Sequence, residues 1–438
     1  MLDGLRILMP RRLSFLFLLM SILPASALWG QTPPAPAQMP GPPAIPIVPP
    51  PQTLPVSGEP LTLDAAFARV LTANPTIAAA RLRRAISVAG IGVAAERPNP
   101  EAHVEFERET PKQDFGLAVP IERGGKRGRR IDVAQAAVAT SEAELAQTII
   151  EVRSQVRKAY FTRVVAEARY AVQDELRQFA LRARDAAQAR FDVGSAPRLE
   201  LLQAQLALAE TENEVASAQA AAQAARISLN ALLGFPLDSN IPLSTALDAT
   251  PGLAAAVALT RAQASNAELA VLDRQIAEQR AKLALAQAMR TPDVTPDDTF
   301  TRDSEPEFMY GWRVAAAATI PVFASHRAGV RVEEATLVQL TAQRGAVLAR
   351  ITGEVTSASL VAEAQRTSYL RYRDEILPQA QDVERMAEDS YRLGQTGIAA
   401  LLQALQQTRE VRLRSLQTAQ ELQDALTELE RAIGAPLP

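Results

Sequence analysis

The sequence predicts a mainly α-helical fold with a small β part and an internal two-fold repeat. Three observations lead to this prediction. Sequence motifs recur about 200 residues apart, long stretches lack glycine and proline, and the hydrophobic period changes from about 3.6 to 2 residues between those stretches. The 438-residue chain is 47% hydrophobic but only 5% aromatic, a composition that suits closely packed helices better than an ordinary globular core.

The N-terminal part predicts a secretory signal peptide over residues 1–27. Three arginines precede a short apolar stretch, which ends at Pro24 and is followed by an Ala-Ser-Ala cleavage motif. A membrane anchor is the alternative, but this apolar stretch is too short to span a bilayer comfortably. Residues 28–60 are dense in proline and are expected to form an extended arm, which we interpret as a linker rather than a tether.

Two copies of one structural repeat are predicted, over residues 61–240 and 241–438. The motif that runs from Phe191 to Ala204 recurs from Tyr391 to Ala404, at an offset of 200 residues. This period is far longer than that of a solenoid. The first copy is expected to run helix, strand, strand, long helix, helix, and the second copy to repeat that order.

Each copy is expected to contain very long helices. Residues 129–193 include neither glycine nor proline, and as one helix they would span on the order of 100 Å. A 36-residue stretch without these residues follows Pro197, and its counterpart runs from Ile398 to Ile433. Leucines in that counterpart form one apolar stripe, so these helices need coiled-coil-like partners.

Two β hairpins, four strands in all, are predicted between the helices. Apolar and polar residues alternate over residues 102–107 and again over 115–121. In the second copy the alternation runs from Phe308 to Val322, and a weakly patterned partner strand lies near residues 294–301.

These strands have the pattern of transmembrane barrel strands, with one apolar face and aromatic residues at one end. Phe308, Tyr310 and Trp312 are expected at the membrane interface. An ordinary soluble sheet covered by helices is the alternative. Since four strands cannot close a barrel and open edges are not tolerated in lipid, several copies are required, and three copies give twelve strands. The expected assembly is a homotrimer, in which a trimeric α-barrel tube joins a 12-strand transmembrane β-barrel.

The duplication and the order of elements resemble the TolC-type outer-membrane factors over nearly all of residues 61–438. Within that family, the CzcC-like heavy-metal efflux subgroup is most similar. The stretches that carry this resemblance are RPNPEAHVEFE, PIERGGKRGRR and IPVFASHRAG.

The resemblance implies an outer-membrane channel subunit of a tripartite efflux system. Such a subunit is a passive exit duct in outer-membrane lipid, and it works with a periplasmic adaptor protein and an inner-membrane RND-type pump. The implied location is the cell outer membrane, with a long periplasmic extension, and the implied cargo is a cation or heavy metal. A drug or protein export duct of the same fold, or a periplasmic coiled-coil adaptor, is the alternative.

The resemblance also places functional sites at two helix–helix turns. Gly194 and Gly394 are expected at the periplasmic tips, where adaptor hairpins dock, although both glycines also fit simple helix caps. Glu200, Tyr391 and Thr396 occupy the positions of the family's aperture-closing network. A carboxylate and a phenol can form a hydrogen bond, but the family's arginine is replaced by Thr396.

Without that arginine, the charge-assisted part of the network is missing unless Arg198 or Arg392 replaces it.

A second conspicuous cluster is basic. Gly124, Gly125, Lys126 and Arg127 are expected at a strand–helix junction, where the glycines let the chain turn and the basic side chains are solvated. A phosphate-binding loop does not fit, because the lysine is followed by arginine.

Several function classes are excluded by composition. The chain has no cysteine and two histidines, His103 and His326, which argues against metal sites and cofactors. No serine-hydrolase or zinc-protease motif occurs, so no catalytic residue is expected and the protein is not expected to be an enzyme. A net charge of −3 argues against nucleic-acid binding.

Overall fold

The structure is a computed structural model that describes residues 60–108, 112–244, 252, 254–302 and 310–437. The chain divides into two units, Met1–Pro50 and Pro51–Pro438, and every described residue belongs to the second unit. The predicted signal peptide, nearly all of the predicted proline-rich arm, and Phe308 lie outside the described residues.

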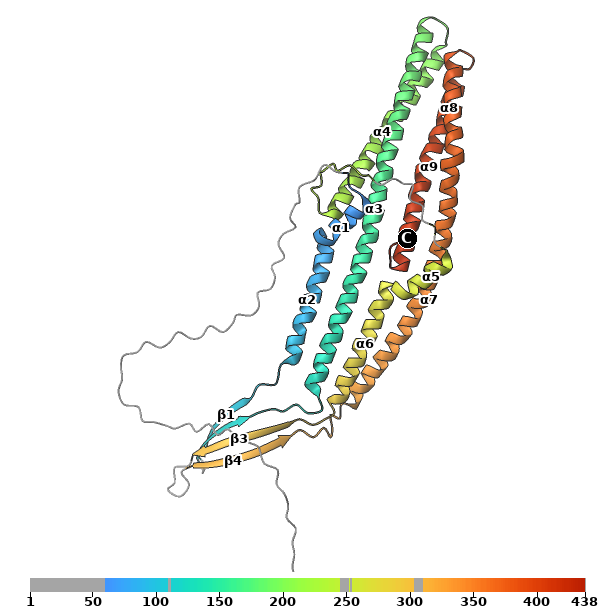
Figure 1. Ribbon diagram of the computed structural model, residues 1–438. Helices are drawn as coiled ribbons and strands as arrows, with labels where there is room; N and C mark the ends of the chain where they lie inside the picture. The colour runs from blue at the N-terminus through green and yellow to red at the C-terminus, as the bar shows by residue number, and fades with distance from the viewer. Residues whose placement is uncertain (1–59, 109–111, 245–251, 253, 303–309, 438) are drawn as a thin grey trace, which may run out of the picture. The chain divides into compact units, whose positions relative to one another are not determined.

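The two halves of the described chain have the same order of elements, and Figure 1 shows how these elements are arranged. The first half contains α1 (Leu63–Ala73), α2 (Pro75–Ala95), β1 (Glu101–Phe106), β2 (Gln113–Ala118), α3 (Lys126–Asp192) and α4 (Arg198–Leu233). The second contains α5 (Ala255–Ser265), α6 (Ala267–Ala288), β3 (Val294–Arg302), β4 (Tyr310–Ala318), α7 (Arg327–Arg371), a π-helical turn (Tyr372–Ile376), α8 (Leu377–Arg392) and α9 (Ile398–Ile433). The predicted mainly α fold with a small β part is confirmed.

Matching asparagine caps tie each half together. Asn74 accepts hydrogen bonds from the first turn of α2, and its Nδ2 donates to the Leu232 carbonyl near the end of α4 at 3.2 Å. Asn266 caps α6 in the same way, and its Nδ2 donates to the Ala432 carbonyl near the end of α9 at 2.9 Å. Each cap satisfies orphan amide groups at a helix start and also fixes that start to a long helix.

The long helix α3 lies at the centre of the helical part. It packs against α2 and α6 toward the strands, against α4 toward the far end, and against α9 of the other half (Figure 1). The largest apolar cluster joins α5, α6, α7 and α9, and a second joins α1, α2, α3 and α4. None of the helices in the described ranges is both long and apolar enough to cross a membrane.

The strands form one antiparallel sheet in the order β1-β2-β3-β4. The two hairpins join through β2 and β3, where Phe115 is opposite Phe300, so β1 and β4 are the edges of the sheet. The weakly patterned partner strand is confirmed as β3. The last predicted strand is shorter than expected, because β4 ends at Ala318 and both Ile320 and Val322 lie beyond it.

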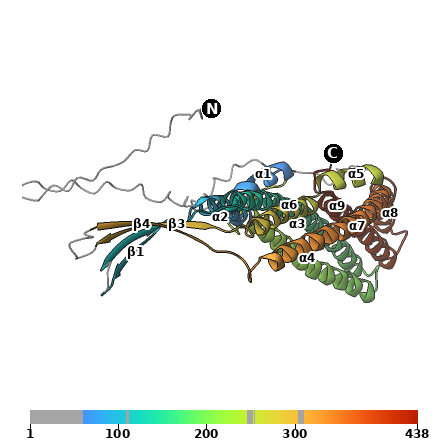
Figure 2. The ribbon, with the colours of Figure 1, turned by 90° about the horizontal axis from the view of Figure 1, so that it is seen from below.

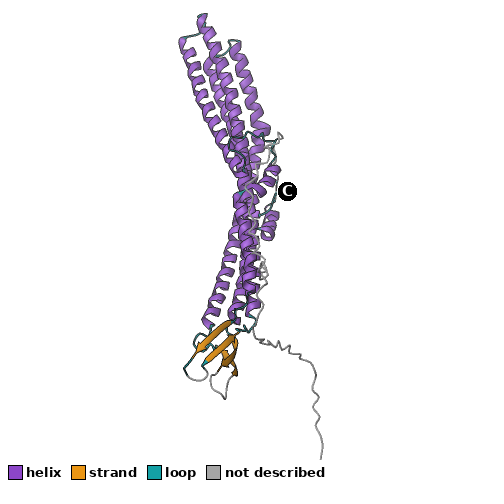
Figure 3. Cartoon of the chain, turned by 90° about the vertical axis from the view of Figure 1, so that its left-hand side faces the viewer, coloured by secondary structure: helices purple, strands orange, loops and turns teal. Residues whose placement is uncertain are grey.

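One face of the sheet is apolar and the other is polar, as the alternation predicts. Val104, Phe115, Phe300 and Trp312 are paired in one row across all four strands. Gln113, Asp298 and Arg302 are polar exceptions on this face. Figures 2 and 3 show the strands extending beyond one end of the helices rather than lying beneath them. The side chain of Trp312 is therefore 70% exposed, although it is large and apolar.

Candidate functional site

The two helix–helix turns at the far end from the sheet have the same backbone geometry. Gly194 follows α3 with φ 74°, and Gly394 follows α8 with φ 71°. Each glycine N–H donates to the carbonyl three residues earlier, at 2.9 and 3.0 Å respectively. A Cβ at either position would meet no atom within 4 Å, so the left-handed backbone rather than lack of space favours glycine here.

A buried polar group joins the two turns. The Tyr391 hydroxyl at the end of α8 donates to Glu200 Oε1 in the first turn of α4, at 3.0 Å. Arg190 near the end of α3 places its Nη1 3.1 Å from the same oxygen, and its guanidinium lies 5.2 Å from the centre of the Tyr391 ring. Tyr391 and Glu200 are both buried. We call Arg190, Glu200 and Tyr391 the tip network.

The surroundings keep the phenol in its neutral form. Burial raises the pKa of Tyr391, the Glu200 carboxylate raises it further, and Arg190 offsets part of this increase. An apolar cluster that includes Phe179, Ile398 and Leu401 packs around the phenol. The hydroxyl therefore remains a hydrogen-bond donor to Glu200 at physiological pH.

The tip network differs from the predicted set at one position. Glu200 and Tyr391 lie together, but Thr396 is an exposed residue of the turn. The charge-assisted contact to Glu200 comes from Arg190, whereas Arg198 and Arg392 are both exposed. Arg190 lies one helical turn before Gly194, so a sharp reversal returns the chain to it. That spacing was the available signal in the sequence.

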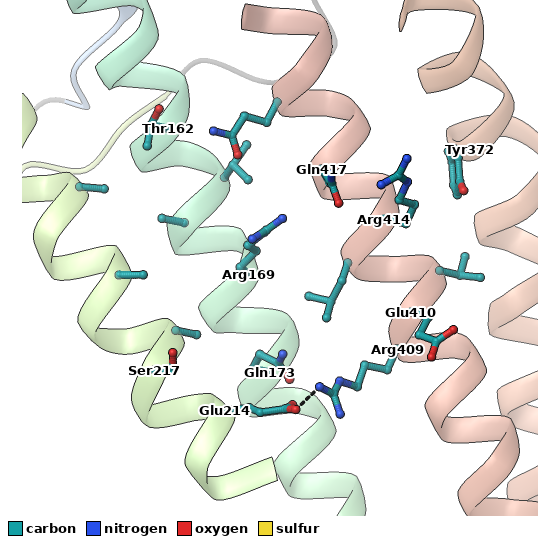
Figure 4. A pocket seen from close by; sticks show the side chains of 18 of the residues that line it. Thr162, Arg169, Gln173, Glu214, Ser217, Tyr372, Arg409, Glu410, Arg414 and Gln417 are labelled. Atoms are coloured by element: carbon teal, nitrogen blue, oxygen red, sulfur yellow. Dashed lines mark hydrogen bonds and ion pairs between the residues drawn. The ribbon is translucent and has the colours of Figure 1, made fainter. Parts of the chain in front are cut away.

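A groove along α3, between α4 and α9, contains a further polar link between the halves. Figure 4 shows Arg409 of α9 reaching across this groove to Glu214 of α4, with which it forms an ion pair. Next along α9, Arg412 contacts Glu175 of α3 and Glu384 of α8, at 2.9 and 2.8 Å. The two pairs of long helices are thus held together by charged contacts below the tips.

The basic cluster lies at the predicted strand–helix junction. Gly124 and Gly125 both have φ near 70°, which lets the chain turn from β2 into α3. Arg127 Nε donates to the Ala95 carbonyl at the end of α2, at 2.6 Å, and so caps that helix.

The expectation that these basic side chains are solvated is wrong for Lys126. This residue is only 6% exposed, and its Nζ lies 2.7 Å from Asp293 Oδ2. Asp293 also accepts a hydrogen bond from the Arg123 N–H at 2.9 Å. The junction therefore joins the two halves, because Asp293 precedes β3. Asp293 is 167 residues from Lys126 and has no local motif, so the sequence did not indicate the pair.

Of the three predicted interface aromatics, two are described. Tyr310 and Trp312 lie on the apolar face of β4 and are 60% and 70% exposed. Tyr310 stacks on Phe300 of β3, with 5.6 Å between ring centres. Large aromatic side chains that are exposed on a sheet face without a covering helix indicate a surface that contacts another protein or a membrane.

Comparisons with known proteins agree with this geometry. Residues 67–235 match the family model described as "Outer membrane efflux protein". The chain is 25% identical to the cobalt-zinc-cadmium resistance protein CzcC of Cupriavidus metallidurans over 379 residues, which cover 85% of this chain and 90% of CzcC.

Solved structures with a similar fold include CusC and CmeC. CusC, whose structures concern transmembrane channel formation, has a TM-score of 0.71 at 16% identity, covering 85% of this chain and 92% of CusC. The CmeC outer membrane channel of Campylobacter jejuni has a TM-score of 0.69 at 15% identity, covering 85% of each chain.

Proposed function

We propose that this chain, which matches the outer membrane efflux protein model over residues 67–235 and is 25% identical to CzcC, is a TolC-type outer-membrane factor and one subunit of a homotrimeric exit duct. Its location is the cell outer membrane, with a long periplasmic extension. The proposal includes a 12-strand barrel, three chains contributing four strands each, and a periplasmic adaptor and an inner-membrane RND-type pump as partners. It involves no catalytic step, since a duct needs a lumen rather than reacting groups.

The observation that supports this proposal most strongly is the open, one-sidedly apolar sheet. In the described chain β1 and β4 each have one unpaired edge, and no helix packs on either face of the sheet. Unpaired backbone groups beside an apolar face are unfavourable in lipid unless the edges pair. Pairing β4 of one copy with β1 of the next satisfies both edges without any other partner.

The helical part extends the same argument away from the membrane. Exposed apolar side chains lie on α2 and α7, the helices at the two sides of the four-helix layer next to the sheet. Ile86 of α2 is 73% exposed, and Val338 of α7 is 70% exposed. Contact between these helices in neighbouring copies would bury both. In the same assembly, the tips at Gly194 and Gly394 would meet around the axis, and adaptor hairpins would dock there.

The cargo is proposed to be a cation or heavy metal. The support is the CzcC relative, whose name assigns it to cobalt, zinc and cadmium resistance. The pump rather than the duct is expected to select the cargo, because a duct wall need not bind everything that passes through it.

Membrane extraction and conductance test the duct. We expect the full-length protein in the outer-membrane fraction, where it requires detergent for extraction. It should migrate as a trimer on unheated gels and as a monomer after heating, and in planar bilayers it should give discrete conductance steps. A water-soluble monomer without conductance would contradict the proposal and would favour a periplasmic coiled-coil adaptor.

A further inference from the structure

Polar side chains from different strands converge on the polar face of the sheet. His103 of β1 is opposite Gly116 of β2, Gly116 is opposite Thr299 of β3, and Thr299 is opposite Arg313 of β4. Asp297 lies two residues before Thr299 and therefore points to the same face.

The imidazole of His103 crosses over β2 to reach β3. A Cβ placed on Gly116 would be 2.1 Å from both Nε2 and Cε1 of the ring, so the ring occupies the space directly above this glycine. The His103 Nε2 lies 3.9 Å from Asp297 Oδ1. Zn–N and Zn–O bonds of about 2.0–2.2 Å in tetrahedral geometry place two ligand atoms about 3.4 Å apart, so a side-chain shift of about 0.5 Å would let one metal ion contact both atoms.

Three oxygen atoms on this face have no hydrogen-bond partner among the described residues. They are Asp297 Oδ1, Asp114 Oδ1 and Thr299 Oγ1. Thr299 is 1% exposed and Asp114 is 7% exposed, so both residues are buried on this face of the sheet. The nearest cation is Arg313, whose Nη2 is 3.7 Å from the other oxygen of Asp114. Buried acceptors without donors favour a ligand that carries positive charge.

We propose that His103 and Asp297 form a binding site for a divalent transition-metal cation on the polar face of the sheet, with Asp114 and Thr299 supplying negative charge and oxygen atoms beside it. An imidazole nitrogen paired with a carboxylate favours ions such as Co²⁺ and Zn²⁺ over Mg²⁺, which prefers oxygen ligands. The claim that exported ions bind this site inside the channel lumen rests on the proposed duct function, whereas metal binding by itself does not.

The site is expected to bind its metal ion with low affinity. In the portion of the chain that the structure describes, no three His, Cys, Asp or Glu side chains are arranged to hold one ion. Two protein ligands therefore leave the other coordination positions to water. Conduction requires binding that is strong enough to admit an ion and weak enough to release it. A binding site with two protein ligands meets this requirement.

The test uses the two histidines as a matched pair, because the chain has only His103 and His326. Equilibrium dialysis of the purified full-length protein in detergent would measure Co²⁺ binding, and the visible absorption of bound Co²⁺ would report nitrogen ligation. We expect about one Co²⁺ per chain, displaced by Zn²⁺ but not by Mg²⁺. His103→Asn and Asp297→Asn should each weaken binding more than about tenfold, whereas His326→Asn should leave it unchanged.

A further variant keeps both ligands but moves one of them. Gly116→Ala puts a methyl group where the His103 ring lies, so it should also weaken Co²⁺ binding, with the strands still formed by circular dichroism. Co²⁺ binding that is absent, or that survives His103→Asn, would overturn the proposed site. Conductance measured on the same samples separates the two proposals, because a conducting protein without Co²⁺ binding loses only the metal site.

Discussion

At the residue scale, the tip network connects three helices through one carboxylate. Glu200 on α4 receives the Tyr391 hydroxyl from α8 and faces Arg190 from α3. Because Glu200 is buried, losing either partner leaves charge or polarity uncompensated in the interior. The three side chains therefore favour the arrangement in which the two tips are held together.

In the proposed duct, removing this network should increase leakage through the closed state. For Tyr391→Phe combined with Glu200→Gln, and separately for Arg190→Gln, we expect higher closed-state conductance in planar bilayers. A hydrogen bond to a charged group contributes about 1.5–3 kcal/mol, so the open fraction should rise on the order of tenfold or more. Arg198→Gln is the matched control, since Arg198 is an exposed arginine on the same tip. Unchanged conductance in both test proteins would remove the network from the gating model.

The residues of this network were predictable to different degrees. Glu200 and Tyr391 could be located because the resemblance fixes their distances from Gly194 and Gly394. Arg190 was missed, although its spacing from Gly194 was an available signal. Asp293, at the strand–helix junction, could not be located, because a motif records positions along the chain whereas this side chain acts across it. The buried state of Lys126 was missed for the same reason, because it depends on Asp293 beside β3.

At the element scale, helix bounds were predictable and helix interruptions were less so. The predicted stretches after Pro197 and from Ile398 coincide with α4 and α9, because glycine and proline end helices for local reasons. The 67-residue α3 is continuous, whereas its counterpart contains a π-helical turn before Pro378. Proline indicates an interruption there, and the π-helical turn also contacts α9, a contact that the local sequence does not indicate.

The asparagine caps should stabilise each half by similar amounts. Asn266→Ala removes an N-cap and the hydrogen bond to Ala432, so we expect a loss of about 1–2 kcal/mol in local opening free energy. Hydrogen exchange of the first turn of α6 would measure this loss, and Asn74→Ala should do the same at α2. Thr62→Ala is the control, because the Thr62 side chain bonds only the nearby Ala65 N–H and its effect should remain within α1. Equal exchange in all three variants would show that the contacts to α4 and α9 do not matter.

At the scale of the whole molecule, the two unpaired edges of the sheet determine how copies of the chain can assemble. The apolar face and four strands follow from alternation along the sequence, but the order in which the strands pair does not. Pairing of β2 with β3 joins hairpins from opposite halves and leaves β1 and β4 as edges. Within one copy these edges are three strand spacings apart, about 14 Å, so they cannot contact each other.

Engineered disulfides can detect the predicted contact between copies, because the natural chain has no cysteine. Glu101→Cys on β1 would be combined in turn with a cysteine at each position from 315 to 318 of β4. A disulfide needs Cα atoms within about 7 Å, so the two edges of one chain are too far apart, whereas paired edges of neighbouring copies are within range. We expect oxidation to give covalent dimers and trimers on denaturing gels.

Yield in this series should alternate along β4. Glu101 shares the polar face with Ala315 and Ala317, whereas Ala316 and Ala318 point to the opposite face. The first pair of positions should therefore cross-link more efficiently than the second. Random aggregation would give equal yields at all four positions, and a monomer would give none. Alternation with covalent trimers as the largest product is the result that requires a sheet closed by three copies.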